Sequence, residues 1–138
     1  MKVFVDTNVL LDVLAKREPF YADAAQIWSL AECGKIQAHV SVISFHNIYY
    51  VVRKEGNLKK AELSLRLMRN VFTPVPLNVQ ILNQAIDADF SDFEDAIQFY
   101  SAIHAAARCL ITRDMDHFPE TVLPVLSPAE YLASLAPE

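Results

Sequence analysis

The sequence is poor in glycine, with only 2 among its 138 residues. Loops that cradle phosphate groups need several glycines, because only a backbone without side chains can approach a phosphate closely. The sequence therefore contains neither a Walker A motif nor a dinucleotide-binding fingerprint, which excludes most nucleotide-cofactor enzymes. Long apolar runs are missing as well. No run approaches the roughly 18 residues that cross a bilayer, and the first residues do not resemble a signal peptide, so we expect no membrane association.

Cysteine and net positive charge are also scarce. The 2 cysteines, Cys33 and Cys109, lie far apart, and we expect both to be reduced, buried thiols in a cytoplasmic protein. Lys and Arg number 12 against 17 Asp and Glu, which gives a net charge of -5. This balance is not typical of a general nucleic-acid coat protein. It does not exclude a nuclease, because a bound cation reverses the local charge of an acidic metal site.

Hydrophobic residues make up 53% of the chain and charged residues 21%, which predicts a single globular domain over residues 1–138. Short apolar segments alternate with helical patterns. This alternation predicts the α/β class, with a three-layer α/β/α fold around a central parallel sheet. The expected strands are residues 3–5, 37–42, 71–75, 109–112 and 122–126. The expected helices are residues 9–16, 20–33, 45–55, 58–70, 79–88, 93–107 and 128–135.

The first strand leads to the residue on which the functional hypothesis depends. Residues 3–5 are wholly apolar, as in strands of parallel sheets, and Asp6 follows them directly. In open α/β sheets the carboxyl ends of the strands form the ligand crevice. Asp6 is then a carboxylate at the functional edge. The alternative is that Asp6 only caps the next helix, which is a common role of aspartate, and the first strand alone does not decide between the two.

Other polar residues are expected at the same edge. Right-handed crossovers make the helices run antiparallel to the strands, so each helix begins near the carboxyl edge of the sheet. Asp114 follows the strand 109–112, and Asp92 caps the helix that leads into that strand. We expect Ser44 to cap the helix 45–55. The residues brought to the edge in this way are Asp6, Ser44, Asn47, Asp92, Asp95 and Asp114.

Carboxylates that meet at one edge repel each other. At about 4 Å and an effective dielectric constant near 20, a like-charged pair costs roughly 4 kcal/mol. One or two divalent cations between them would offset this repulsion, and hard oxygen ligands suit Mg²⁺ or Mn²⁺. Water on such an ion is more easily deprotonated and can attack phosphorus, while the ion offsets charge on the leaving oxygen. The pattern therefore predicts metal-assisted hydrolysis of phosphodiesters.

Several of these segments resemble motifs of the PIN-domain family, and especially of the VapC-like toxins of bacterial toxin–antitoxin pairs. The matching segments are residues 5–8 (VDTN), 93–96 (FEDA) and 112–114 (TRD), followed by Phe118. Residues 40–54 also look like part of a PIN subgroup. Each segment is weak by itself, but together they span nearly the whole chain in the same order and with suitable spacing.

The resemblance implies a Mg²⁺- or Mn²⁺-dependent ribonuclease, a hydrolase that acts on an RNA substrate. By position, Asp6, Asp95 and Asp114 look like the acidic metal ligands and catalytic residues of the family. Asn8 and Thr112 look like residues that orient those acids by hydrogen bonds. The family also implies a small antitoxin protein as partner and a homodimer. Separately, the basic residue beside the last of these acids, Arg113, is our candidate for a substrate contact.

The chain departs from the family pattern at one position. Many VapC-like proteins have a glutamate in the helix after the second strand, where this chain has Asn47. Together with Ser44, we expect Asn47 to support the ligands without adding charge. Asp92 lies one turn before Asp95 on the same helix face, and we expect it to supply the missing carboxylate as a metal ligand. Glu94 is expected to point elsewhere. Two residues not matched to any motif, Asp12 and Asp116, are expected to be solvated surface acids.

The departure leaves an alternative function open. In this alternative, the chain is a weakly active or inactive PIN module that binds RNA or a protein partner, because Asn47 replaces an acid. A phosphatase-like hydrolase is a third possibility, since such enzymes also have an aspartate after the first strand. They need a second aspartate two residues later, where this chain has Asn8.

Overall fold

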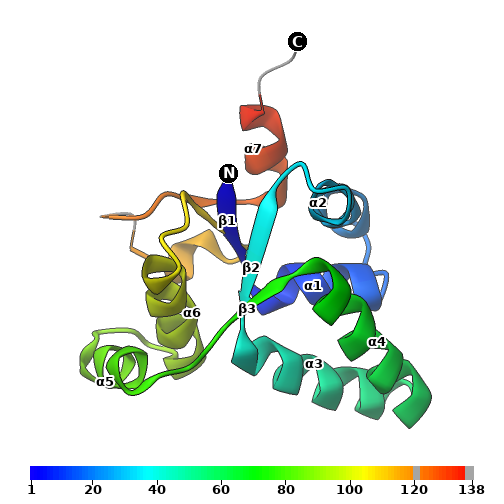
Figure 1. The fold of residues 1–138 in the computed structure, drawn as a ribbon, viewed down its shortest axis with the longest axis horizontal. Helices are drawn as coiled ribbons and strands as arrows, with labels where there is room; N and C mark the ends of the chain where they lie inside the picture. Colours follow the sequence, from blue (N-terminus) through cyan, green and yellow to red (C-terminus); the bar gives the residue numbers. More distant parts are fainter. Residues whose placement is uncertain (120–121, 136–138) are drawn as a thin grey trace.

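A five-stranded parallel sheet runs through the centre of the protein in the order β3-β2-β1-β4-β5. The computed structural model describes residues 1–119 and 122–135 (Figure 1). The strands are Lys2–Val5 (β1), Gln37–Ser41 (β2), Thr73–Val75 (β3), Leu110–Ile111 (β4) and Val125–Leu126 (β5). The predicted parallel sheet is therefore confirmed, and the proline-containing strand β3 lies at an edge, where its missing N–H is tolerated.

Every predicted helix is also present, with ends that differ from the prediction by a few residues. The α-helices are Thr7–Leu14 (α1), Tyr21–Glu32 (α2), Val42–Glu55 (α3), Leu58–Val71 (α4), Val79–Asp87 (α5), Phe93–His104 (α6) and Pro128–Ser134 (α7), and Met115–His117 forms a 3₁₀ turn. None of the helices in residues 1–119 and 122–135 has the length and apolar character needed to traverse a bilayer.

The alternating side chains of β1 show how the sheet separates two cores. Val3 and Val5 pack into one apolar cluster with helices α1 to α4 and α7, whereas Phe4 packs into the other with α5 and α6. Figure 1 shows α5 and α6 on one side of the sheet and α1 to α4 on the other. The predicted three-layer α/β/α arrangement is confirmed, because each face of the sheet buries its apolar side chains against helices.

Two expectations are wrong at this level, one about the cap of the third helix and one about the burial of a cysteine. Ser44 does not cap the third helix, because Ser41 has extended backbone angles and its hydroxyl accepts a hydrogen bond from the Ile43 N–H. The helix thus begins earlier, and Ser44 becomes a buried residue within its first turn. Cys33 is exposed and not buried, because it lies after the last turn of α2, while Cys109 is buried as predicted and both thiols are free.

Candidate metal centre

Asp6 lies between β1 and α1, at the carboxyl edge of the sheet. Its carboxylate is 5% exposed and accepts two hydrogen bonds. The Thr7 N–H donates to Oδ1 at 2.7 Å, and the Thr112 hydroxyl donates to Oδ2 at 2.8 Å. The structure confirms the capping role that the sequence analysis considered for Asp6, and its role as a metal ligand stays a prediction. Asp6 caps the first helix, and it also faces the residues that follow the neighbouring strand β4.

The charge state of Asp6 reflects its neighbours. The pKa of Asp6 is raised from 3.8 to about 7, mainly by burial. The charges of Asp95 and Glu94 contribute to this rise, and the hydrogen bonds from Thr112 and Thr7 oppose it. The acids of the first strand and of helix α6 are thus within electrostatic reach of each other. Of the acids predicted to converge, Asp6 and Asp95 lie close enough for the charge of Asp95 to act on Asp6.

The loop that carries Asp114 is fastened to α1 by the Asn8 side chain. The Asn8 amide donates to Asp114 Oδ2 at 3.1 Å and to the Thr112 hydroxyl at 3.3 Å, and its carbonyl accepts from the Arg113 N–H at 3.3 Å. The Asp114 N–H in turn donates to the Thr112 hydroxyl at 3.0 Å. The structure thus brings the expected orienting residues, Asn8 and Thr112, into direct contact with the acids.

Helix α6 presents its first turn to the same edge. The Asp92 side chain caps this helix, with Oδ1 accepting from the Asp95 N–H at 3.0 Å. Asp95 Oδ2 lies 3.1 Å from His117 Nδ1, in the 3₁₀ turn after Asp114. The pKa of Asp95 is raised by burial and by Asp92, while His117 lowers it. His117 was not among the predicted site residues, and its position three residues after Asp114 was the available signal.

A second set of polar side chains lies buried below Asp6. The Thr7 hydroxyl is 2.7 Å from the Ser44 hydroxyl and 3.4 Å from Glu94 Oε2. The Gln98 amide donates to both hydroxyls, at 3.1 Å to Thr7 and 3.2 Å to Ser44. The expectation that Glu94 points elsewhere is therefore wrong. Asn47 is half-buried and forms no side-chain hydrogen bond within the described part of the chain.

The Arg113 side chain contacts two other side chains of the protein. Its Nε lies 2.7 Å from Asp12 Oδ2, and its guanidinium carbon lies 4.0 Å from the centre of the Phe20 ring. Asp12 is fully buried, so the prediction of a solvated surface acid is wrong for this residue. Asp116 is exposed as expected. Arg113 is itself 25% exposed, and only that part of its side chain is open to solvent.

The donor set suits a hard divalent cation, because it consists of carboxylate, amide and hydroxyl oxygens. Asp6 is buried and Asp95 is half-buried, and the pKa of each is raised by burial and by neighbouring carboxylates. A cation would relieve the repulsion between these carboxylates. In residues 1–119 and 122–135, however, no three His, Cys, Asp or Glu side chains are already grouped to hold an ion. An ion here would have few protein ligands and several waters, which is the usual coordination of Mg²⁺.

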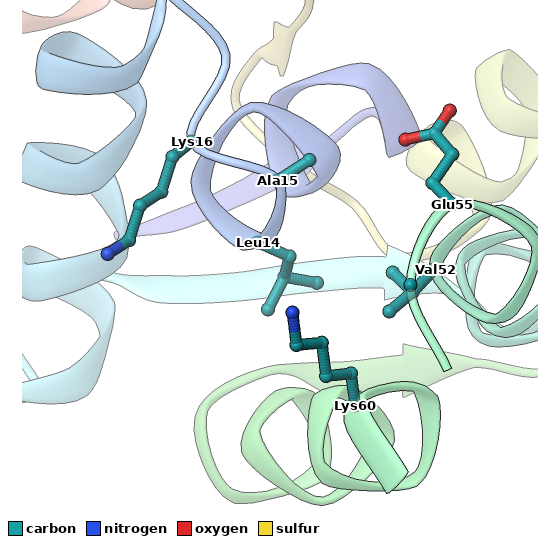
Figure 2. A pocket seen from close by; sticks show the side chains of 7 residues that line it. Leu14, Ala15, Lys16, Val52, Glu55 and Lys60 are labelled. Atoms are coloured by element: carbon teal, nitrogen blue, oxygen red, sulfur yellow. The ribbon is translucent and has the colours of Figure 1, made fainter. Parts of the chain in front are cut away.

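A cavity lies away from these acids. It has a volume of about 490 Å³ and is lined by the ends of α1 and α3 and the start of α4. Figure 2 shows Leu14 and Lys60 pointing into it from opposite sides, with Glu55 at its margin. Because Asp6 precedes the first turn of α1 and Leu14 ends that helix, the cavity is separated from the acids by the length of α1. Its lining does not include any of the predicted site residues.

Known proteins share both the sequence pattern and the fold. A family model described as a PIN domain matches residues 2–116. Ribonuclease VapC1 of Aquifex aeolicus is 25% identical over 122 residues, covering 85% of this chain and 84% of its own length. A toxin–antitoxin complex from Klebsiella pneumoniae contains a chain with a TM-score of 0.68 and 21% identity, over 91% of this chain and 97% of that one.

A further solved structure extends the likeness to nearly the full length of both chains. VapBC-1 from nontypeable Haemophilus influenzae contains a chain with a TM-score of 0.69 and 17% identity, over 94% of this chain and 99% of that one. At these identities the solved structures establish the fold alone. They confirm the predicted PIN-like α/β/α architecture.

Proposed function

The chain belongs to the PIN-domain family, and on this premise we propose that it is a divalent-metal-dependent ribonuclease that hydrolyses phosphodiester bonds in RNA. The observation that carries the proposal is the environment of Asp6. Burial, together with the charges of Asp95 and Glu94, raises the pKa of this carboxylate to about 7. The hydrogen bonds it accepts come from the Thr7 N–H and the Thr112 hydroxyl, neither of which is cationic. Strongly perturbed acids at a ligand crevice are typical of functional sites.

We assign the metal to Asp6, Asp95 and Asp114 as ligands and catalytic residues, with Asp92 as a further ligand. When bound, Mg²⁺ or Mn²⁺ supplies an activated water and offsets negative charge on the phosphate. The chain itself orients the acids, since hydrogen bonds from neighbouring side chains fix the direction of ligating carboxylates. These orienting contacts are Thr112 on Asp6, Asn8 on Asp114, and His117 on Asp95.

Substrate contact through Arg113 remains part of the proposal. The pairing with Asp12 and the stacking on Phe20 hold its guanidinium in one place. A guanidinium is a suitable partner for a phosphate oxygen, and Arg113, whose side chain is 25% exposed, directly precedes Asp114 in the sequence. Arg113 therefore has two proposed roles, which are to hold the loop after β4 and to meet the RNA backbone.

We further propose that the protein is the toxin of a toxin–antitoxin pair and that it forms a homodimer. The curated relative is named Ribonuclease VapC1, and the structural neighbour from Klebsiella pneumoniae comes from a toxin–antitoxin complex. The hairpin of α3 and α4 carries large apolar side chains that are exposed, as is typical of protein-binding surfaces. They are Tyr50, Leu58, Leu63 and Leu67.

The activity is tested by giving single-stranded RNA to the purified protein with Mg²⁺, with Mn²⁺ and with EDTA. We expect cleavage only with metal, and we expect Asp6→Asn to abolish it. Asp23→Asn is the matched control, because Asp23 is an exposed acid in the first turn of α2. Equal cleavage with EDTA, or full cleavage by Asp6→Asn, would refute the assignment. Metal binding measured by calorimetry without turnover on any RNA would instead identify a binding module.

The partner is tested by co-purifying the protein with the product of the neighbouring reading frame. We expect a stable complex that suppresses RNA cleavage, and we expect light scattering to give twice the monomer mass for the protein alone. A protein that stays monomeric at high concentration would remove the homodimer from the proposal. A neighbouring product that neither binds nor inhibits would remove the antitoxin.

A further inference from the structure

We propose that Glu94 is the additional carboxylate of the metal centre, in the role that Asn47 cannot fill. The geometry also assigns a positioning role to Gln98, Ser44 and Thr7, which form a hydrogen-bond chain directed at Glu94. This inference rests on the proposed function, because it concerns the same metal centre. It goes beyond the sequence analysis, which took Asp6, Asp92, Asp95 and Asp114 as the metal ligands and directed Glu94 elsewhere.

A count of hydrogens shows which group donates and which accepts along the hydrogen-bond chain. The hydroxyls of Thr7 and Ser44 take part in four contacts. One joins the two hydroxyls, two join the Gln98 amide to each of them, and one joins the Thr7 hydroxyl to Glu94. Four contacts need four hydrogens. The Gln98 amide supplies two and each hydroxyl supplies one. The count is met only if the amide nitrogen of Gln98 faces the hydroxyls, because its oxygen would bring no hydrogen.

With both hydroxyls accepting from Gln98, one assignment satisfies the remaining two contacts. Ser44 donates to Thr7 over 2.7 Å, and Thr7 donates to Glu94 Oε2 over 3.4 Å. In the opposite assignment Thr7 would use its hydrogen on Ser44, and Glu94 would receive none. The carboxylate of Glu94 is thus the acceptor at which the chain ends. The chain holds that carboxylate toward the edge where Asp6 lies.

Because these residues are buried, a different arrangement of donors and acceptors would cost free energy. Gln98 and Ser44 are 0% exposed and Thr7 is 6% exposed, so water does not compete for their polar atoms. A buried donor or acceptor that loses its partner costs about 1–3 kcal/mol. Gln98, Ser44 and Thr7 come from α6, α3 and α1, and the chain therefore links three helices below the site.

Glu94 suits the role better than the residues predicted from the sequence. Asp92 uses Oδ1 to cap α6, whereas in residues 1–119 and 122–135 the side chain of Glu94 has one hydrogen bond, from the Thr7 hydroxyl to Oε2 at the long distance of 3.4 Å. Glu94 is half-buried and its charge acts on Asp6. Asn47 lies one turn beyond Ser44 on α3 and brings no charge. A carboxylate from α6 thus takes the place of the absent carboxylate from α3.

The first test measures Mn²⁺ binding to the full chain by calorimetry. We expect Glu94→Gln to weaken binding by about 10-fold or more, and Thr7→Val by about 10-fold, which is the usual range for residues that orient metal ligands. Thr7→Ser keeps the hydroxyl and should bind as the wild type does. Ser101→Ala is the matched control, because Ser101 is a buried hydroxyl of α6 that has no hydrogen-bond partner among the residues that the structure describes.

The double variant Thr7→Val/Glu94→Gln separates positioning from general damage to the fold. If Thr7 acts through Glu94, the double variant binds Mn²⁺ as weakly as Glu94→Gln alone, since coupled residues are not additive. The side-chain amide of Gln98, followed by NMR without metal, should shift in Thr7→Val and stay in place in Glu94→Gln and Ser101→Ala. Circular dichroism confirms that each variant is folded, and Glu94→Gln alone suffices if Thr7→Val does not fold.

The outcomes distinguish this inference from the proposed function. If Glu94→Gln binds Mn²⁺ as tightly as the wild-type protein, or if the effects on affinity are strictly additive in the double variant, the inference is overturned while the metal centre stays intact. Failure of the wild-type protein itself to bind Mn²⁺ or to cleave RNA would overturn the proposed function and the inference with it.

Discussion

Two buried aspartates at opposite ends of α1 have opposite surroundings. Asp6 at the start of the helix is 5% exposed, and Asp12 within it is fully buried. Burial is the largest cause of a raised pKa in both. Asp12 has the cation of Arg113 at 2.7 Å, which lowers its pKa again. Asp6 has hydrogen bonds from Thr7 and Thr112 but other acids as its charged neighbours.

The difference agrees with the proposal that the buried charge of Asp12 serves the fold and that of Asp6 serves a ligand. A buried carboxylate is costly unless an opposite charge or several hydrogen bonds compensate it. The protein supplies the opposite charge for Asp12 from its own sequence. For Asp6 it supplies only donors and adds further negative charge, and such an arrangement is stabilised when a cation arrives from outside.

The largest expected effect distinguishes the two aspartates by activity. Asp6→Asn should lower RNA cleavage by about 10³-fold, roughly 4 kcal/mol, because a metal supplies several kcal/mol of charge stabilisation in such reactions. The free energy of unfolding without metal should not fall, since the substitution removes a repelled charge. Initial cleavage rates and urea unfolding measure the two quantities. A variant that loses activity only because it unfolds more easily would contradict this expectation.

The next effect should appear in stability at the Asp12 pair. Arg113→Met leaves the Asp12 carboxylate buried without its cation, and should lower the free energy of unfolding by about 3 kcal/mol. The double variant Asp12→Asn/Arg113→Met should recover most of that loss, because the orphaned charge is gone. Urea unfolding of the two single variants and the double variant measures this. Losses that simply add would show that the pair is not coupled.

A smaller effect is expected in the pH dependence of the metal-free protein. The pKa of Asp6 is raised from 3.8 to about 7 in the folded state. The folded state therefore holds this proton more tightly than the unfolded state, and stability falls as the pH rises through this window. The fall, on the order of 2 kcal/mol, should be absent from Asp6→Asn. Thermal unfolding of both proteins in EDTA between pH 5 and pH 8 tests it, and parallel curves would contradict it.

The smallest effect is the gain in stability with metal. An ion that binds only the folded state stabilises it by about 1.4 kcal/mol at ten times its dissociation constant. Thermal unfolding with increasing Mg²⁺ should show this gain in the wild-type protein and in Asp12→Asn, but not in Asp6→Asn. EDTA should reverse it. A gain that persists in Asp6→Asn would place the ion elsewhere.

Much of the fold was predictable from local patterns. Apolar strands, helical spacing and residues such as Asp92, whose side chain caps α6 as predicted, are read over a few neighbours in the chain. The handedness of crossovers then places the strand ends at one edge, and the electrostatic contact between Asp6 and Asp95 agrees with that placement. The metal ligands themselves remain a prediction for the experiments above.

The sequence by itself determined the class of fold, the order of its elements and the edge at which the acids meet, because all three depend on short-range periodicity and chain direction. Only the tertiary structure decided the fate of Asp12 and Glu94. Helical spacing directed both away from the site, yet Asp12 meets Arg113 and Glu94 meets Thr7. These partners come from distant segments, and a side chain's charge partner is set by packing between segments, which local sequence patterns do not contain.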